Sequence, residues 1–167
     1  MVTRREILLG SAGVAAIAAA GIGVVRWSGG QATAATKKHF EITKTPAEWR
    51  KLLTPEQYAV LREEDTERPF SSPLDNEKRK GTFVCAGCDL PLFASETKFD
   101  SGTGWPSFYT PIKGAVELGK DWSFGLLRDE LHCRRCGGHL GHLFNDGPKP
   151  TGLRYCINGL AMKFVPA

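Results

Sequence analysis

The stretch Arg154-Tyr155-Cys156-Ile157-Asn158, near the C-terminus, has a hydrophobic pattern of period two. Its two bulky apolar residues, Tyr155 and Ile157, alternate with three residues of other kinds, which is typical of a half-buried β-strand. On such a strand the Cys156 thiol shares one face with the guanidinium of Arg154 and the carboxamide of Asn158. A lone cysteine here is either a small core residue or a functional thiol, and the strand pattern does not distinguish the two.

The chain from Gly81 to the C-terminus consists of short apolar or alternating runs separated by glycine and proline. Short strands between such turn signals are typical of antiparallel sheets. We expect strands over residues 82–85, 122–128, 131–133, 139–144, 153–158 and 161–165. The prediction is a mainly β body.

Two short helices are predicted before this body. Residues 45–48 and 54–57 each begin with threonine, have proline at the first helical position and end in glutamate or glutamine, which is the capping-box pattern. The second helix is expected to end near Glu63. A loop without helix is predicted over residues 64–80, where proline, serine and charged residues dominate. The apolar residues expected to face the core are Trp49, Leu52, Leu53, Tyr58 and Leu61.

Residues 1–34 are predicted to be a twin-arginine (Tat) signal peptide. Arg4-Arg5 precedes an uncharged run of 19 residues, and Ala32-Thr33-Ala34 is a small-x-small cleavage site. We expect cleavage after Ala34, export to the periplasm or another extracytoplasmic space, a polar tether over 35–44 and one domain over 45–167. The alternative is a retained membrane anchor, because 19 uncharged residues can just span a bilayer.

The charge composition gives little reason to expect a nucleic-acid partner. Outside residues 1–34 the chain has 19 basic and 17 acidic residues, a net charge of +2. Basic residues cluster only at residues 78–80 and 134–135, and we interpret both clusters as solvated turns.

Four of the five cysteines form two Cys-x-x-Cys knuckles, at residues 85–88 and 133–136. Two knuckles can place four thiolates about 2.3 Å from one zinc ion, and such a closed site is structural because no position remains for water. Two disulfides are the alternative in an exported protein, but a bridge within Cys-x-x-Cys closes a very small loop. A thioredoxin-like motif needs one such pair beside a βαβ unit. We therefore assign the zinc ligands as Cys85, Cys88, Cys133 and Cys136, which leaves Cys156 alone.

Two histidines, His139 and His142, lie between the second knuckle and Cys156. On a regular strand they would point to opposite faces, but a bulge at Gly141 would direct both rings inward. Trp105 lies in the glycine-rich loop over residues 99–108. It is either a core residue or a wall for a methyl or thioether group, which packs well against an aromatic ring.

Taken together, these residues resemble the methionine-R-sulfoxide reductase (MsrB) family. The matching stretches are residues 66–70, both knuckles, 99–108, 139–147 and 154–158, in family order. The resemblance implies a fold of two antiparallel sheets (the β-tent), a structural zinc ion, and reduction of the R epimer of methionine sulfoxide. It also implies that Cys156 is the catalytic thiol and that Trp105 packs against the substrate methyl group. The positions that match the family's polar active-site residues are His139, His142, Asp146, Arg154 and Asn158.

The chemistry of these side chains is consistent with the resemblance. A thiolate must attack the sulfoxide sulfur, and a neighbouring Arg154 would favour the anion. The sulfoxide oxygen must gain protons, which suits His139 and His142, and Asp146 is expected to orient one of the two rings. The product on the enzyme is then a Cys156 sulfenic acid.

The sequence departs from the family pattern at Thr103. Many members carry a resolving cysteine at this position, and the chain has no spare thiol. We therefore expect an external small thiol or a thioredoxin-like partner to reduce the sulfenic acid. Two alternative functions are a zinc-ribbon-like interaction module without redox activity and a zinc hydrolase that uses His139 and His142. Neither requires Cys156 and Trp105.

Overall fold

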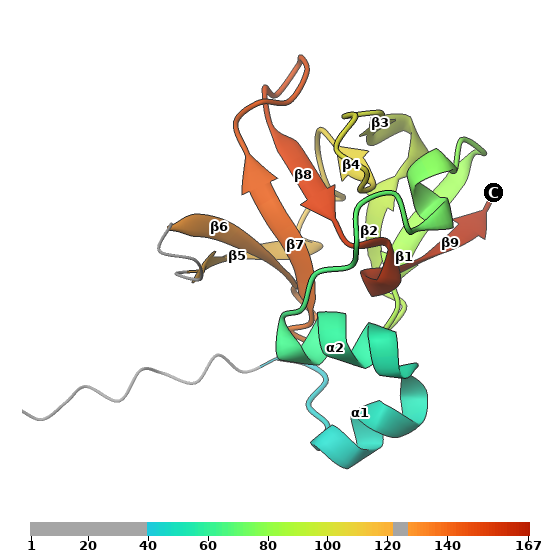
Figure 1. Cartoon of the computed structure of the whole chain (residues 1–167), viewed down its shortest axis with the longest axis vertical. Coiled ribbons are helices and arrows are strands. Elements are labelled where there is room, and N and C mark those ends of the chain that lie inside the picture. Colours follow the sequence, from blue (N-terminus) through green and yellow to red (C-terminus); the bar gives the residue numbers. More distant parts are fainter. Residues whose placement is uncertain (1–39, 122–126) are drawn as a thin grey trace, which may run out of the picture. The chain divides into compact units, whose positions relative to one another are not determined.

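The computed structural model describes residues 40–121 and 127–167 (Figure 1). The predicted signal peptide, its cleavage site and most of the strand expected over residues 122–128 lie outside the described residues. Within those two ranges no helix is long and apolar enough to cross a membrane. The described end of the predicted tether contacts the second knuckle, because the Ile42 amide donates to the Arg135 carbonyl at 3.0 Å and Glu41 pairs with Arg134 at 2.7 Å.

Both predicted helices form where their capping boxes place them. Helix α1 spans Pro46–Leu52 and α2 spans Pro55–Glu63, and the threonine before each accepts a hydrogen bond from the third helical amide. Four of the five expected apolar residues are buried, but Leu52 is 60% exposed and that prediction is wrong. Successive helical residues point about 100° apart, so a two-turn helix that buries Trp49 and is followed by a buried Leu53 turns Leu52 towards solvent.

The loop predicted over residues 64–80 contains one short helical turn, so the prediction of no helix there is wrong. Residues Pro73–Asn76 form a 3-10 helix, and the Ser72 hydroxyl accepts a hydrogen bond from the Leu74 amide at 3.2 Å. Further single 3-10 turns occur at Ser95–Thr97 and Gly159–Ala161. These short turns carry no hydrophobic periodicity, so the sequence gives little sign of them.

The strands of the described residues form two antiparallel sheets, as predicted (Figure 1). One has the order β2-β1-β9 and the other the order β3-β4-β8-β7-β6-β5. The bounds are β1 Gly81–Cys85, β2 Pro91–Ala94, β3 Lys98–Phe99, β4 Ser107–Phe108, β5 Val116–Asp121, β6 Arg128–Cys133, β7 His139–Phe144, β8 Arg154–Ile157 and β9 Met162–Pro166.

Four of these strands, β2 to β5, were not predicted. Strands β3 and β4 have two residues each, too few for a period to show. Strand β5 is an edge strand with the sequence Val-Glu-Leu-Gly-Lys-Asp, and none of its side chains is fully buried. Edge strands commonly carry charged residues, so β5 lacks the apolar pattern of a core strand.

The core contains aromatic contacts between the two sheets. Phe108 of β4 stacks on Phe93 of β2 with ring centroids 4.3 Å apart, and it meets the edge of Phe83 of β1 at 5.0 Å. All three rings are fully buried, and burial of each stabilises the fold by roughly 1.5–3 kcal/mol. Because β4 pairs with β8, this packing fixes the strand that carries Cys156.

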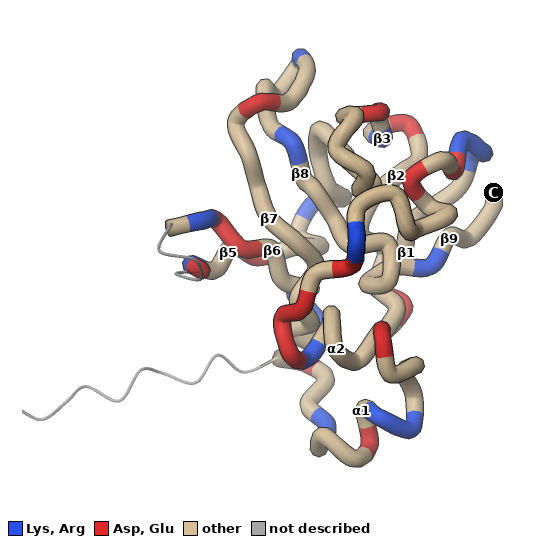
Figure 2. The backbone as a smooth tube through the Cα atoms, viewed as in Figure 1, with Lys and Arg blue, Asp and Glu red and all other residues tan. Residues whose placement is uncertain are grey.

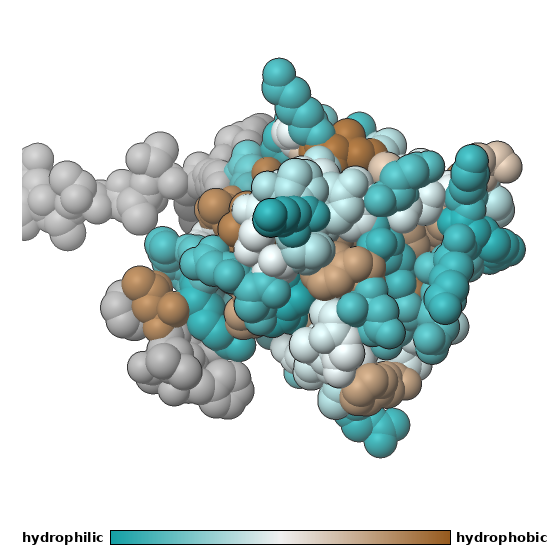
Figure 3. Space-filling view, turned by 90° about the horizontal axis from the view of Figure 1, so that it is seen from above, coloured by the Kyte–Doolittle hydropathy of each residue, from teal (hydrophilic) through white to brown (hydrophobic). Residues whose placement is uncertain are grey.

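The surface is mixed in charge and largely polar. Basic and acidic residues are interspersed along the described chain (Figure 2). The face shown in Figure 3 is mostly hydrophilic, with small and separate apolar areas. An acidic bend, formed by Glu63, Glu64 and Asp65 at the end of α2, is the longest acidic segment visible in Figure 2.

Candidate active site

Cys156 lies on β8, between β4 and β7, in the strand that the sequence predicted. In the paired registers it lies opposite Ser107 on one side and His142 on the other. The half-buried thiol faces a cavity of about 110 Å³. The residues that line this cavity are Thr66, Trp105, Arg128, Gly141, His142, Phe144, Cys156 and Asn158. The fold therefore brings all four of these predicted residues to one cavity. Cys156 and His142 lie on the neighbouring strands β8 and β7, whereas Trp105 and Asn158 lie outside the strands.

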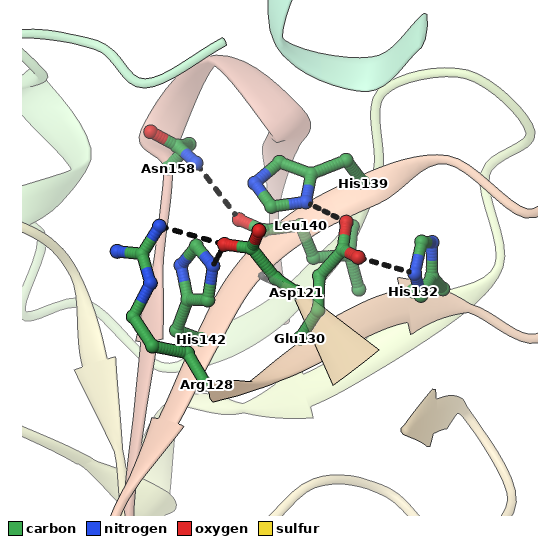
Figure 4. Close-up of polar contacts among 8 residues, drawn as sticks. All are labelled: Asp121, Arg128, Glu130, His132, His139, Leu140, His142 and Asn158. Atoms are coloured by element: carbon green, nitrogen blue, oxygen red, sulfur yellow. Dashed lines mark hydrogen bonds and ion pairs between the residues drawn. The ribbon is translucent and has the colours of Figure 1, made fainter. Parts of the chain in front are cut away.

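Hydrogen bonds to the backbone hold Trp105 and Asn158 in place. The Trp105 indole donates to the carbonyl of Glu67 at 3.1 Å. The Asn158 carboxamide accepts from the Glu67 amide at 3.0 Å and donates to the Leu140 carbonyl at 3.2 Å (Figure 4). Asn158 is almost fully buried, so its amide cross-links the loop after α2 to β7 at the edge of the cavity.

Arg154 is paired with Asp146, and this corrects one prediction. Both carboxylate oxygens of Asp146 accept from the Arg154 guanidinium at 2.8 Å, and the guanidinium also lies 4.3 Å from the centre of the Phe144 ring. The expectation that Asp146 orients a histidine is therefore wrong. Asp146 lies beyond the end of β7, beside the Arg154 end of β8, and its side chain is 62% exposed.

Both histidine rings lie on the same side of β7, as a bulge at Gly141 predicted. The register between β6 and β7 shifts next to this position, and the rings of His139 and His142 are 5.4 Å apart. Gly141 has φ +154°, and a Cβ placed there would lie 2.0 Å from the Cys156 carbonyl oxygen. A side chain at this position would separate β7 from β8.

Two carboxylates that the sequence analysis missed hold these rings (Figure 4). Glu130 of β6 lies 2.5 Å from Nδ1 of His139. Asp121, at the end of β5, lies 3.0 Å from Nε2 of His142 and also accepts from Arg128 at 2.6 Å. The only sequence signal was a charged residue, Glu130, directly beside an apolar one in a short strand.

A second, larger cavity adjoins the first. It has a volume of about 530 Å³, and its lining includes Thr66, Arg128 and His142, which also line the Cys156 cavity. Its remaining lining residues are Glu63, Glu64, Asp65, Asp121, Glu130 and His139. The acidic bend seen in Figure 2 therefore forms one wall of the approach to the histidines.

The local environment shifts the pKa values of the central groups. Burial raises the pKa of the Cys156 thiol, and the Arg154 charge and the Thr103 hydroxyl oppose only part of this effect. Arg154 thus favours the thiolate, as expected, but desolvation outweighs it. Burial likewise lowers the pKa of His142, despite its bond to Asp121.

Thr103 lies against the thiol. Its hydroxyl oxygen is 4.0 Å from Sγ of Cys156 and 2.8 Å from the hydroxyl of Ser101, which in turn contacts Ser107 at 2.8 Å. A short side chain at position 103 is therefore directed at Cys156.

The four knuckle cysteines form a cluster that could hold a metal ion. Their sulfur atoms all lie within 4.8 Å of one another, and the cross-knuckle pairs Cys85–Cys136 and Cys88–Cys133 are 3.8 and 3.5 Å apart. Four sulfurs at about 2.3 Å from zinc would be about 3.8 Å apart at the corners of a tetrahedron. The donor set and its dimensions therefore fit a closed tetrahedral thiolate site.

Comparison with known proteins identifies the family. The SelR domain model matches residues 53–166. A peptide methionine sulfoxide reductase MsrB from Agrobacterium fabrum is 58% identical over 127 residues, which is 75% of this chain and 94% of that protein. The corresponding proteins of Leptospira interrogans and Methanosarcina barkeri are 55% and 56% identical, over 75% and 74% of this chain and 97% and 87% of their own lengths. The chain therefore belongs to the SelR family, the family of the MsrB methionine sulfoxide reductases.

Proposed function

We propose that the chain reduces the R epimer of methionine sulfoxide in peptides and proteins, with Cys156 as the nucleophile. Membership of the family makes it an oxidoreductase of the methionine sulfoxide reductase class. The observation that carries the proposal is the position of the thiol: Cys156 faces a small cavity with an indole on one side and a carboxylate-held imidazole opposite it.

Substrate recognition is assigned to Trp105 and the cavity beside it. The indole is held by its bond to the Glu67 carbonyl, so its face is a fixed wall against which the methyl group of the sulfoxide packs. The bound sulfur would then lie next to Cys156, and its oxygen would point towards the adjoining cavity of the two histidines. With the methyl group, the oxygen and the sulfur each held in place, the two epimers would direct the peptide chain differently, which allows the site to select one of them.

The first step requires removal of the thiol proton. Burial keeps Cys156 protonated at neutral pH, whereas the lowered pKa of His142 keeps that ring neutral and able to accept a proton. Asp121 binds Nε2 of His142, so Nδ1 is the nitrogen available for the transfer. The thiolate then attacks the sulfoxide sulfur while His139 protonates the oxygen. The bond between the two sulfurs then breaks as the protonated oxygen passes from the methionine sulfur to the Cys156 sulfur. The methionine sulfur gains two electrons, Cys156 loses two, and the products are methionine and a Cys156 sulfenic acid.

Regeneration is assigned to an external reductant. The four other cysteines of the chain lie in the metal cluster, and position 103 presents a hydroxyl to Cys156. One external thiol condenses with the sulfenic acid and releases water, and a second thiol releases Cys156 as the reductant becomes a disulfide. A small thiol or a thioredoxin-like protein serves this role.

The metal is assigned as structural zinc, held by Cys85, Cys88, Cys133 and Cys136. A closed thiolate site would tie the turn after β1 to the turn after β6 and takes no part in the reaction. For residues 1–34 the proposal remains a Tat signal cleaved after Ala34, with export of the domain. N-terminal sequencing of the protein recovered from the cell envelope tests this, because an intact residue 1 indicates a retained anchor.

The decisive experiment compares the two sulfoxide epimers. The purified chain with dithiothreitol is expected to reduce a peptide containing the R epimer and to leave the S epimer unchanged. Cys156→Ser is expected to lose the activity. Equal rates on both epimers, or full activity of Cys156→Ser, would refute the proposal, and a zinc-loaded chain that reduces neither epimer would support the interaction-module alternative.

A single turnover without reductant tests the regeneration step. Mass spectrometry is expected to find one added oxygen on Cys156 of the wild-type chain. Thr103→Cys places a second thiol at about the same position, so this variant is expected to form a disulfide with Cys156 and to become a substrate for thioredoxin. An intramolecular disulfide in the zinc-loaded wild-type chain would contradict the assignment.

A further inference from the structure

The two active-site histidines are held by opposite ring nitrogens (Figure 4). Glu130 contacts Nδ1 of His139, whereas Asp121 contacts Nε2 of His142. The ring nitrogen that no carboxylate holds therefore differs between them. It is Nε2 in His139 and Nδ1 in His142, so the rings are not interchangeable as proton donors or acceptors.

Glu130 is buried, and each of its carboxylate oxygens contacts a histidine. The residue is only 6% exposed, and its second oxygen, Oε2, lies 3.1 Å from Nε2 of His132. On the adjacent strand β5, Gly119 lies opposite Glu130. A Cβ at Gly119 would be 2.9 Å from Nε2 of His132 and 3.6 Å from Oε2 of Glu130. The contact between Glu130 and His132 thus depends on the absence of a side chain at position 119.

The carboxylate of Glu130 is ionised at neutral pH. Burial alone would raise its pKa, but the hydrogen bonds with His132 and His139 outweigh burial and hold the pKa at about 2. An ionised carboxylate can only accept hydrogen bonds, so Nδ1 of His139 must carry a proton. Nε2 of His139 is buried, has no hydrogen-bond partner among the described residues, and belongs to a ring that lines the larger cavity.

We infer that Glu130 is a positioning residue, which fixes the ring orientation and the tautomer of His139 so that Nε2 is the nitrogen that exchanges a proton with the substrate oxygen. With its proton on Nδ1, the neutral ring accepts at Nε2, and it donates from Nε2 only after it has taken up a second proton there. The role of His139 as the proton donor rests on the proposed function. The tautomer does not, because it follows from the contacts of the resting protein. Glu130 itself does not donate the proton, since it is already ionised and both its oxygens are bound to histidines.

The test combines a spectroscopic and a kinetic measurement on the full-length, zinc-loaded protein. Nitrogen and carbon NMR of histidine-labelled wild-type protein is expected to show His139 with its proton on Nδ1 when the ring is neutral. Glu130→Gln removes the charge and offers an amide that can donate as well as accept, so the ring is expected to lose this single tautomer. The kcat is expected to fall roughly 10- to 100-fold with KM within about twofold, since general acid catalysis contributes on the order of 10² to 10⁴.

Asp129→Asn is the matched control. It removes one negative charge from the same strand, but Asp129 is partly exposed and pairs with Lys120. This variant is expected to keep the His139 tautomer and the wild-type kcat. If both variants lowered kcat equally, the effect would be a general loss of charge and the inference would fail.

The inference is supported only if Glu130→Gln changes both the His139 tautomer and kcat. A proton on Nε2 of neutral His139 in the wild-type protein overturns it, and so does a Glu130→Gln variant that changes the tautomer alone or kcat alone. If Glu130→Gln does not fold, Glu130→Asp replaces it, because the shorter side chain withdraws the carboxylate from Nδ1 of His139 and the same joint change is expected. A wild-type protein that shows the predicted tautomer but reduces no sulfoxide refutes the proposed function and the proton-transfer role, while the positioning contact stands.

Discussion

Gly141→Ala is expected to destabilise the fold far more than an alanine at another glycine with positive φ. The added Cβ would lie 2.0 Å from the Cys156 carbonyl oxygen, whereas ordinary contacts are 3.4–4 Å. The obstacle is backbone, so no side-chain rotation relieves it, and β7 must move by more than 1 Å from β8 at the point where His142 faces Cys156.

The expected loss in the free energy of unfolding of Gly141→Ala is the sum of three costs. Overpacking against an unyielding neighbour costs about 1–3 kcal/mol. Holding a side chain at a rarely adopted backbone conformation costs about 1–3 kcal/mol. Separating the strands weakens one or two ladder hydrogen bonds, each worth about 1 kcal/mol. The sum is roughly 3–8 kcal/mol, a large part of the 5–15 kcal/mol that stabilises a typical domain.

Gly152→Ala is the matched control, because Gly152 has φ +70° but nothing within 4 Å of a Cβ there. It carries the backbone cost alone, about 1–3 kcal/mol. Urea unfolding of both variants, at fixed zinc concentration, gives the difference. A Gly141→Ala free energy of unfolding no lower than that of Gly152→Ala would refute the close-approach argument. The folded fraction of Gly141→Ala is also expected to lose kcat, while Gly152→Ala keeps it.

Three further predictions concern the metal, the thiol and an acid-labile contact. Removal of zinc by a chelator is expected to lower the unfolding temperature and to make four more thiols reactive towards Ellman's reagent, since structural zinc contributes on the order of 10 kcal/mol to folding; an unchanged transition would contradict this. Alkylation of Cys156 by iodoacetamide is expected to rise with pH about a midpoint above the ordinary thiol value of 9.0, and Arg154→Gln should move it higher because a charge that lowers this pKa is lost. Glu130 has a pKa of about 2 against an ordinary value of 4.5, so its ionised form stabilises the fold by up to about 3 kcal/mol above pH 4.5, and this contribution is lost as the pH falls through about 2. The stability difference between wild-type and Glu130→Gln should therefore shrink over that range in denaturant titrations.

The parts of the fold that sequence predicted are those with local signals. Both helices begin at capping boxes, which are complete within four residues. Strands β1, β7, β8 and β9 contain short apolar or alternating runs, bounded by turn residues. Strand β5 has no such pattern. It lies at the edge of its sheet, carries charged residues, and has no fully buried side chain.

The site shows the same division between local and distant signals. The thiol, the two histidines and the knuckles were found because their residue types are chemically distinctive and closely spaced. The carboxylates that hold the histidines were not, because Glu130 and Asp121 lie 9 and 21 residues before the rings that they contact. Only the pairing of β5, β6 and β7, with its shifted register, brings them together. Asp146 was predicted from its match to a polar active-site position of the family, and its carboxylate pairs with Arg154 instead of a histidine.

The environment of Cys156 favours the neutral thiol over the thiolate in the resting protein, because burial raises its pKa. A permanent thiolate at this position would be the form most open to oxidation by peroxide, and the chain offers no second thiol beside it to trap the sulfenic acid as a disulfide. Burial raises the thiol pKa and so limits this loss, while His142 lies opposite as a neutral acceptor for the proton. Arg154 then stabilises the anion once it forms. Under the proposed mechanism, in which an external thiol regenerates Cys156, the enzyme would gain from the same burial that makes its nucleophile a weaker one at rest.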